Sequence, residues 1–183
     1  MEIRNILNVC GLGNLFYVES PNFSVQWLKS HVARSLQDQF IQSWQAEVRH
    51  KEICTLYKSF KTDFVFENYL VKLSRQQSLT LCKDRTGNHR LLVTLGRHTN
   101  IYTPWAQRYC TFCTSSQMGD EVHVLLECTN IDIVQLRKRY LPKYYQIRPS
   151  VFKFVTLMES LSNNPRLARK VSLLCQSINR MSK

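Results

Sequence analysis

Apolar residues recur at helical intervals along much of the chain. Between Val25 and Val48 they follow one another at three- and four-residue steps, which predicts one long amphipathic helix with Ser24 as its N-cap. Such a stripe can bind a partner, but it more often packs on its own domain, so we expect core here. The stripe consists of Val25, Leu28, Val32, Leu36, Phe40, Trp44 and Val48.

Shorter helical patterns surround this element. The first ten residues are expected to form a helix that stops at Gly11. Residues 53–60 continue the helical pattern, and residues 64–73 fit either a strand or a short helix. The segment from Ser74 to Asp84 predicts another helix, with Leu79, Leu81 and Cys82 facing inward.

Three further helices are predicted after Ile131. The first breaks at Pro142, Ser150 caps the second, and Pro165 opens the third at its first turn. The third helix is expected to turn Leu167, Val171, Leu174 and Ile178 inward and Arg166, Arg169, Lys170 and Arg180 outward. Its outward cations make it a candidate for contacts with phosphate groups.

Four possible metal ligands lie within nineteen residues, in the stretch YCTFCTSSQMGDEVHVLLECTN from Tyr109 to Asn130. The spacing is C-x2-C-x9-H-x4-C, formed by Cys110, Cys113, His123 and Cys128. Three thiolates and one imidazole complete a tetrahedral zinc site with no position left for a substrate water, which is typical of a structural Zn²⁺. The alternative is buried cysteines and a hydrogen-bonded core histidine, but Cys110 and Cys113 sit in a polar, turn-rich segment.

The turn residues between the two ligand pairs support this interpretation. Met118, Gly119 and Asp120 are expected to bring the pairs together, and Asp120 can cap a helix that starts at Glu121. The fold prediction is therefore a mainly α protein with a small Cys3His zinc-knuckle module inserted between N-terminal and C-terminal helices. The predicted segments are helices over 1–83, a basic loop with the knuckle over 84–133, and basic helices over 134–183.

Composition narrows the class of protein. The 183 residues are 44% hydrophobic and 11% aromatic, which fits a globular chain with a core. No apolar run approaches the ~18 residues of a membrane span, and no secretory leader is recognisable, so we expect an intracellular protein of the nucleus or cytoplasm. The seven cysteines are an odd number, which favours reduced thiols and metal binding over a disulfide framework.

The net charge of +12 is concentrated at the C-terminal end. From Val134 onward there are 11 Lys and Arg and one acid, Glu159, so this part carries +10 and the preceding residues only +2. A one-sided charge of this size attracts polyanions, although it can also be a solvated helix face. Because it follows the metal motif directly, we favour nucleic acid as the partner.

The stretch from Lys83 to Arg108 interleaves basic and aromatic residues. Guanidinium groups hold phosphates and exposed rings stack on unpaired bases, but a polar loop between helices would have the same composition. Candidate stacking residues are Tyr102, Trp105 and Phe112. The candidate nucleic-acid contacts, including three cations after the metal motif, are Arg85, His89, Arg90, Arg97, Arg108, Arg137, Lys138 and Arg139.

The chain also resembles a known family over these motifs. The strings RTGNHRLLVTLGRH from Arg85, T-P-x5-C-x2-C from Thr103, GDEVHVLLEC from Gly119 and LRKRYLPKYY from Leu136 are similar to the carboxyl-terminal region of reverse transcriptases from animal non-LTR (LINE-type) retrotransposons. The resemblance is sharpest over residues 85–154 and extends less specifically over 27–60. One departure is Thr94-Leu95, where many relatives have an acid before the Gly-Arg pair.

The resemblance implies a zinc-binding domain downstream of a polymerase, associated with recognition of the element's RNA and target DNA. Cys110, Cys113, His123 and Cys128 match the family's ligand positions, and Arg85, His89, Gly96 and Arg97 match its motif before the knuckle. Polymerase chemistry needs paired carboxylates that converge on two metal ions, and no aromatic-x-Asp-Asp segment is present. We therefore expect a fragment or relic without polymerase activity rather than an enzyme.

Three hypotheses follow from the sequence. The first is a zinc-stapled module that binds nucleic acid, RNA rather than sequence-read duplex DNA, with no membrane partner. The second is a structural or protein-interaction domain in which zinc only holds the fold. The third is an enzyme that uses Cys110 or Cys113 with His123 as nucleophile and base, but a thiolate bound to zinc is not a free nucleophile.

Overall fold

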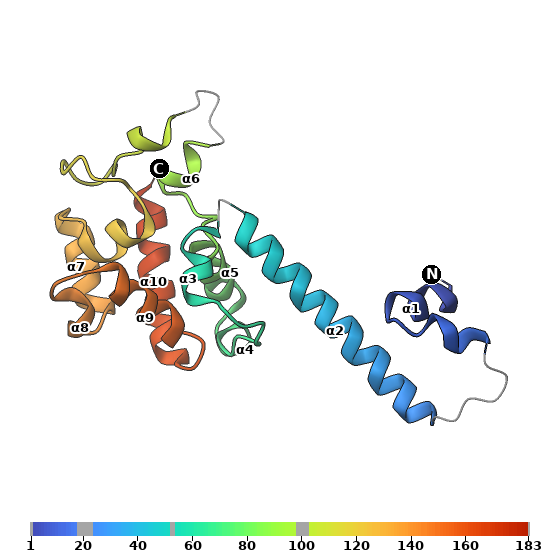
Figure 1. The fold of residues 1–183 in the computed structure, drawn as a ribbon. Helices are drawn as coiled ribbons and strands as arrows, with labels where there is room; N and C mark the ends of the chain where they lie inside the picture. Colours follow the sequence, from blue (N-terminus) through green and yellow to red (C-terminus); the bar gives the residue numbers. More distant parts are fainter. Residues whose placement is uncertain (1, 18–23, 52–53, 98–102, 183) are drawn as a thin grey trace. The chain divides into compact units, whose positions relative to one another are not determined.

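The computed structural model describes residues 2–17, 24–51, 54–97 and 103–182, and it is mainly helical (Figure 1). Over this part of the chain the only strand-like pairing is an isolated antiparallel bridge between Tyr109 and Met118. The mainly α prediction is therefore confirmed. The helices are α1 (Ile3–Val9), η1 (Gly13–Tyr17), α2 (Val25–His50), α3 (Tyr57–Phe60), α4 (Tyr69–Lys72), α5 (Arg75–Arg85), α6 (Leu92–Leu95), η3 (Trp105–Gln107), η4 (His123–Glu127), α7 (Ile131–Tyr140), α8 (Lys143–Gln146), α9 (Val151–Ser160) and α10 (Pro165–Met181).

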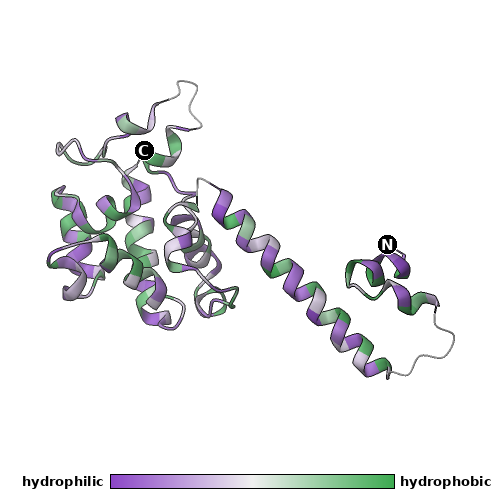
Figure 2. Cartoon of the chain, viewed as in Figure 1, coloured by the Kyte–Doolittle hydropathy of each residue, from purple (hydrophilic) through white to green (hydrophobic). Residues whose placement is uncertain are grey.

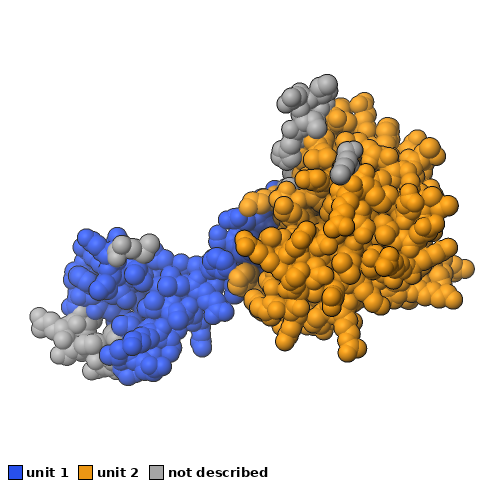
Figure 3. Space-filling view, turned by 180° about the vertical axis from the view of Figure 1, so that it is seen from behind, with its two compact units in different colours: residues 1–50 blue, residues 51–183 orange. Residues whose placement is uncertain are grey.

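The chain divides into two compact units, residues 1–50 (unit 1) and residues 51–183 (unit 2), which Figure 3 colours separately. The three predicted segments, 1–83, 84–133 and 134–183, are not compact units of their own. Helix α10 packs against α5 and α7, so parts of all three segments share the core of unit 2. The Cys/His motif lies between α6 and α7 within this unit.

Unit 1 consists of α1, η1 and the long helix α2. Helix α1 stops as predicted, because Gly11 adopts a φ of +73°, which favours glycine. Helix α2 also matches its prediction, and Ser24 Oγ accepts a hydrogen bond from Trp27 N at 3.1 Å as its cap.

The expectation that the apolar stripe of α2 is core is wrong. No residue of α2 is buried, and Val25 and Phe40 are 69% and 57% exposed. Figure 2 shows hydrophobic and hydrophilic residues alternating along the whole helix. A helix of 26 residues is about 39 Å long, and the short α1 and η1 offer too little apolar surface to cover such a stripe.

The core of unit 2 is built around α10. Its buried face carries Leu167, Val171, Leu174 and Ile178, as predicted, and Arg166, Arg169, Lys170 and Arg180 are exposed. Asn164 Oδ1 caps this helix by accepting a hydrogen bond from Leu167 N at 3.0 Å. Helix α9 packs against α3, and the ring centroid of Phe154 in α9 lies 6.2 Å from that of Phe60 in α3.

Local signals located the other helix starts of unit 2. Ser74 and Gln77 form a reciprocal capping box at α5, and Ser150 caps α9. The ambiguous segment 64–73 contains the single turn α4 and no strand. Leu81 is fully buried as predicted, but Leu79 is 51% exposed because it lies on the opposite side of α5.

In the described part of the chain, none of the helices has the length and apolar character needed to cross a membrane.

Candidate metal centre

A short hairpin positions the first pair of candidate ligands. The bridge between Tyr109 and Met118 is closed by hydrogen bonds from Cys110 N to Gln117 O at 2.8 Å and from Gly119 N to Arg108 O at 2.9 Å. A Cβ atom on Gly119 would lie 3.0 Å from Cys110 Cα, which is an unusually tight contact. Any larger residue would therefore push the backbone apart by a few tenths of an ångström where the two halves of the motif meet.

A π-helical turn positions the second pair. Asp120 Oδ1 accepts a hydrogen bond from His123 N at 2.8 Å, which confirms the predicted cap. From His123 to Glu127 the helix widens to η4, and Cys128 N donates to His123 O at 2.6 Å. An α-helix would turn residues five apart to different faces, whereas the i to i+5 closure of a π-turn aligns them. The His-x4-Cys spacing therefore delivers both side chains to one side.

The four candidate ligands converge on one point. The sulfur atoms of Cys110 and Cys128 lie 3.8 Å apart, and Cys113 Sγ lies 3.3 Å from His123 Nε2. All four ligand atoms lie within 4.8 Å of one another. Around a tetrahedral Zn²⁺ with bonds of about 2.3 Å to sulfur and about 2.0 Å to nitrogen, ligand atoms are about 3.5–3.8 Å apart. The group therefore has the composition and the spacing to hold a metal ion.

The site is closed on most sides. Cys110, His123 and Cys128 are buried, and only Cys113 is partly exposed. Asn130 ties the hairpin to α7, because its Nδ2 donates to Phe112 O at 2.9 Å while its Oδ1 caps the helix. Four protein ligands in a closed site leave no position for a substrate, so the arrangement suits a structural metal.

Two charged residues, Glu127 and Arg137, flank the ligands, and neither was predicted from the sequence as part of the metal site. Glu127 Oε2 lies 3.9 Å from His123 Nδ1, which has no hydrogen-bond partner among the described residues. A carboxylate beside the second ring nitrogen is the usual way to orient a metal-binding histidine. On the other side, Arg137 is buried, and its Nη1 donates to Leu126 O at 2.6 Å. Its cation offsets the net negative charge that three thiolates would leave around a divalent ion.

The three thiols differ in acidity in the absence of a metal. Burial raises the pKa of Cys128 to about 12 and also raises the pKa of Cys110. Burial acts in the same direction on Cys113, but hydrogen bonds from Ser115 and His123 outweigh it and lower the pKa of that thiol to about 5. Cys113 is therefore the thiolate available to a metal first, and the buried pair must lose protons as the metal binds.

Four of the eight predicted nucleic-acid contacts are buried, so the expectation that they form a surface is wrong for Arg85, His89, Arg108 and Arg137. Arg85 pairs with Glu67, and its guanidinium lies over the rings of Phe60 and Tyr69. Glu67 also accepts a hydrogen bond from Ser162 Oγ at 2.6 Å. This arginine is thus used to connect helices inside unit 2.

The other three buried candidates also have internal partners. His89 Nε2 lies 2.7 Å from Glu121 Oε1, and its Nδ1 accepts a hydrogen bond from Leu91 N at 3.2 Å. Arg108 donates to the carbonyl oxygens of Thr103 and Val93, each at 2.9 Å. Arg137 contacts the backbone beside the metal ligands, as described above. A polar or charged side chain needs a partner when buried, and the fold supplies one to each of these residues.

The remaining candidates are accessible. Arg90, Lys138 and Arg139 are exposed, and Arg97 is half-buried. Trp105 is 43% exposed, with the Arg97 guanidinium 5.6 Å from its ring centroid. Phe112 is half-buried against the core, and Tyr102 lies outside the described residues.

Comparison with known proteins found no family model, no curated protein and no solved structure that matches this chain. The site therefore has to be interpreted from its own geometry.

Proposed function

We propose that this chain is a zinc-binding module that binds nucleic acid. The observation that carries the zinc part is the convergence of three sulfurs and one imidazole nitrogen within 4.8 Å. When bound, Zn²⁺ would cross-link the hairpin of Cys110 and Cys113 to the π-helical turn of His123 and Cys128. Its contribution there is to folding, because all four positions are taken by protein ligands.

Charge and exposure support the nucleic-acid part. The segment from Val134 onward carries +10, and its cations on α7 and α10 face solvent except for the buried Arg137. Among them are Lys138 and Arg139, whereas acids are almost absent from this part of the sequence. Such a surface neutralises phosphates and releases their counterions. We propose RNA rather than duplex DNA, because none of the helices carries a pattern for reading base pairs in a groove.

The resemblance to the carboxyl-terminal region of LINE-type reverse transcriptases is consistent with this function and stays a proposal. Under it, the Cys3His group would be the zinc-binding part of such a region. No polymerase activity is proposed, since the sequence carries no aromatic-x-Asp-Asp motif.

A protein-interaction domain is the second candidate, and exposed apolar side chains favour it. Val65, Phe66 and Val71 are each more than 60% exposed and come from one short segment before and within α4. Exposed apolar residues that gather in one region often mark a contact surface for another protein.

Two measurements test the proposed function. Elemental mass spectrometry of the purified chain, before and after chelation, should find about one Zn²⁺ per chain, and circular dichroism should show structure lost with the metal. Binding of a labelled single-stranded RNA should weaken steeply as salt increases. An intact fold without zinc would refute the metal part, and the absence of salt-dependent RNA binding would favour the protein-interaction domain.

A further inference from the structure

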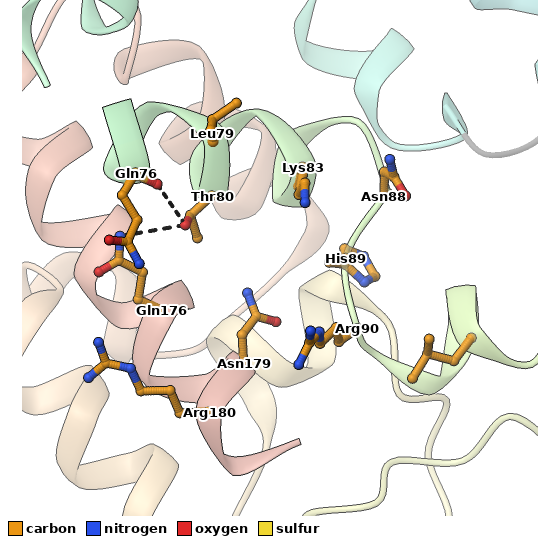
Figure 4. A pocket seen from close by; sticks show the side chains of 11 residues that line it. Gln76, Leu79, Thr80, Lys83, Asn88, His89, Arg90, Gln176, Asn179 and Arg180 are labelled. Carbon is orange, nitrogen blue, oxygen red and sulfur yellow. Dashed lines mark hydrogen bonds between the residues drawn. The ribbon is translucent and has the colours of Figure 1, made fainter. Parts of the chain in front are cut away.

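A polar groove of about 600 Å³ lies in unit 2, away from the four metal ligands. Helix α5 forms one wall, the C-terminal half of α10 forms another, and the segment from Asn88 to Leu95 closes the end (Figure 4). The residues that line it are Gln76, Leu79, Thr80, Lys83, Asn88, His89, Arg90, Leu95, Gln176, Asn179 and Arg180.

Three cations reach this groove from its three sides. Lys83 comes from α5, Arg90 from the closing segment and Arg180 from the end of α10, and all three are exposed. Within the described part of the chain, none of these three cations forms an ion pair. The residues that line the groove include no Asp or Glu. Unpaired cations that line one hollow favour an anionic ligand, although the Arg180 guanidinium points away from the other two in Figure 4.

Side-chain amides occupy the space between the cations. Gln76 and Gln176 lie beside Thr80, whose Oγ1 donates to Gln76 O at 2.9 Å and accepts from Gln176 Nε2 at 3.5 Å. Asn88 and Asn179 stand nearer to Arg90. Amides offer both donors and acceptors, which suits the hydrogen-bonding edge of a nucleobase better than a simple anion.

Two leucines add apolar surface to the same hollow. Leu79 is 51% exposed and Leu95 is 40% exposed, and both line the groove. Exposed apolar surface beside amides and cations provides a place for the flat face of a base. The exposure of Leu79, which contradicted its prediction as a core residue, is accounted for if it lines a ligand site.

The groove is attached to rigid elements. Helices α5 and α10 are joined by a hydrogen bond from Ser172 Oγ to Gln77 O at 2.9 Å. Next to Arg90, the buried ring of His89 is held between Leu91 N and Glu121 Oε1. Because Glu121 stands two residues before the metal ligand His123, the metal module also holds the segment that carries Arg90.

We propose that this groove binds an unpaired polynucleotide segment, with its phosphates at Lys83, Arg90 and Arg180 and its base edges at the amides. The inference rests on the proposed nucleic-acid function and assigns it to one surface. A volume of about 600 Å³ is in the range of small-ligand sites and admits a single strand, whereas a double helix cannot enter it.

The test compares two charge-matched double variants of the full chain. Arg90→Gln with Arg180→Gln removes two cations from the groove, and Lys58→Gln with Lys72→Gln removes two exposed cations of unit 2 that neither line the groove nor belong to the basic C-terminal segment. The probe is a labelled twelve-nucleotide single-stranded RNA of mixed sequence, measured by fluorescence anisotropy. Metal content and circular dichroism verify that each variant is folded.

The groove variant should lose at least about tenfold in affinity, and the control variant less than about twofold. The slope of log K against log salt should become shallower by about 1.4 in the groove variant, because each lost phosphate contact removes about 0.7 on a single strand. An RNA duplex of the same sequence should bind more weakly than the single strand, and uridine monophosphate should compete only at far higher concentrations.

The two levels of the proposal fail in different ways. If the wild-type chain binds no RNA, the proposed function and this inference are both overturned. If the wild-type chain binds RNA but the two double variants lose affinity equally, only the assignment to the groove is overturned. Preference for the duplex would reject the unpaired strand as ligand, and full competition by the mononucleotide would identify a small-molecule site instead.

Discussion

Cys113 is the candidate ligand that solvent reaches, and the one thiol of the cluster with a lowered pKa, about 5. The buried Cys110 and Cys128 have raised pKa values and depend on the metal to become thiolates. At neutral pH the site therefore starts with one negative ligand and gains its full charge only as the ion enters. This order couples metal binding to proton release.

Replacing Cys113 with serine should abolish stoichiometric zinc binding. Three remaining ligands hold the ion weakly, and a ligand present at about 1,000 times its Kd stabilises a fold by about 4 kcal/mol, so we expect a loss of that order. For a unit of this size the melting temperature should fall by roughly 10 °C. Elemental mass spectrometry and thermal denaturation measure the two effects.

Cys82→Ser is the matched control for that experiment. Cys82 lies outside the cluster, where its Sγ is 3.7 Å from the hydroxyl of Tyr69, and serine retains a polar group there. Its zinc content should equal that of the wild-type chain. Unchanged zinc in the Cys113 variant would show that the cluster is not the metal site.

Asp84 should make stability depend on pH. Burial raises its pKa from 3.8 to about 6, despite the opposing effects of His89 and of hydrogen bonds with Cys175 and Asn179, and the charge of Glu121 adds to the increase. A raised pKa means that the protonated form favours folding, so this contribution is complete below pH 3.8 and is lost as pH rises through 6. The shift corresponds to roughly 3 kcal/mol when complete.

The Asp84→Asn variant removes this titration. It should be more stable than the wild-type chain at pH 7.5, and its advantage should shrink by about 1 kcal/mol at pH 5. Urea denaturation of both proteins at both pH values provides the comparison. An advantage that stays constant with pH would mean that Asp84 does not titrate in this range.

At the scale of elements, Asn130 joins the metal hairpin to α7. Its Oδ1 accepts hydrogen bonds from Asp132 N and Ile133 N at 3.0 and 3.2 Å, and its Nδ2 donates to Phe112 O. One side chain thus starts a helix and also holds the loop between Cys110 and Cys113. The cap follows from a sequence rule, but the contact with Phe112 spans eighteen residues and does not.

Two substitutions separate these roles. Asn130→Ala should cost about 2 kcal/mol, roughly half from the cap and half from the lost contact with the hairpin. Asn130→Asp keeps the cap and loses the amide donor, so it should cost about 1 kcal/mol. Both should speed the transfer of metal to a chelator. Equal costs for the two variants would show that the cap contributes nothing.

The helices were predictable to the extent that their signals are local. Ser74, Ser150 and Asn164 mark helix starts through bonds to backbone groups three residues away, and the spacing of the metal ligands is equally local. The burial of Arg85 was not predictable from the sequence, because only tertiary packing brings Glu67 and the aromatic rings into contact with it. Likewise, the periodicity of α2 predicted a helix but not what covers it.

At the scale of the whole molecule, the candidate metal centre and the groove both lie in unit 2. All four metal ligands and every residue of the polar groove belong to residues 51–183, and the core cluster runs from Phe60 to Ile178. Unit 1 contributes a long helix in which none of the residues is buried. Neither the metal centre nor the groove therefore draws a side chain from unit 1.

Removing residues 1–50 should accordingly leave the rest functional. The shortened chain should keep about one Zn²⁺, unfold within about 2 °C of the full chain, and bind single-stranded RNA with an affinity within about twofold, because every contact assigned to these properties lies in unit 2. It should also be more soluble, since the apolar stripe of α2 is gone. Metal analysis, calorimetry and anisotropy on the two proteins measure these quantities. Loss of zinc or of cooperative unfolding would mean that residues 51–183 do not fold without residues 1–50.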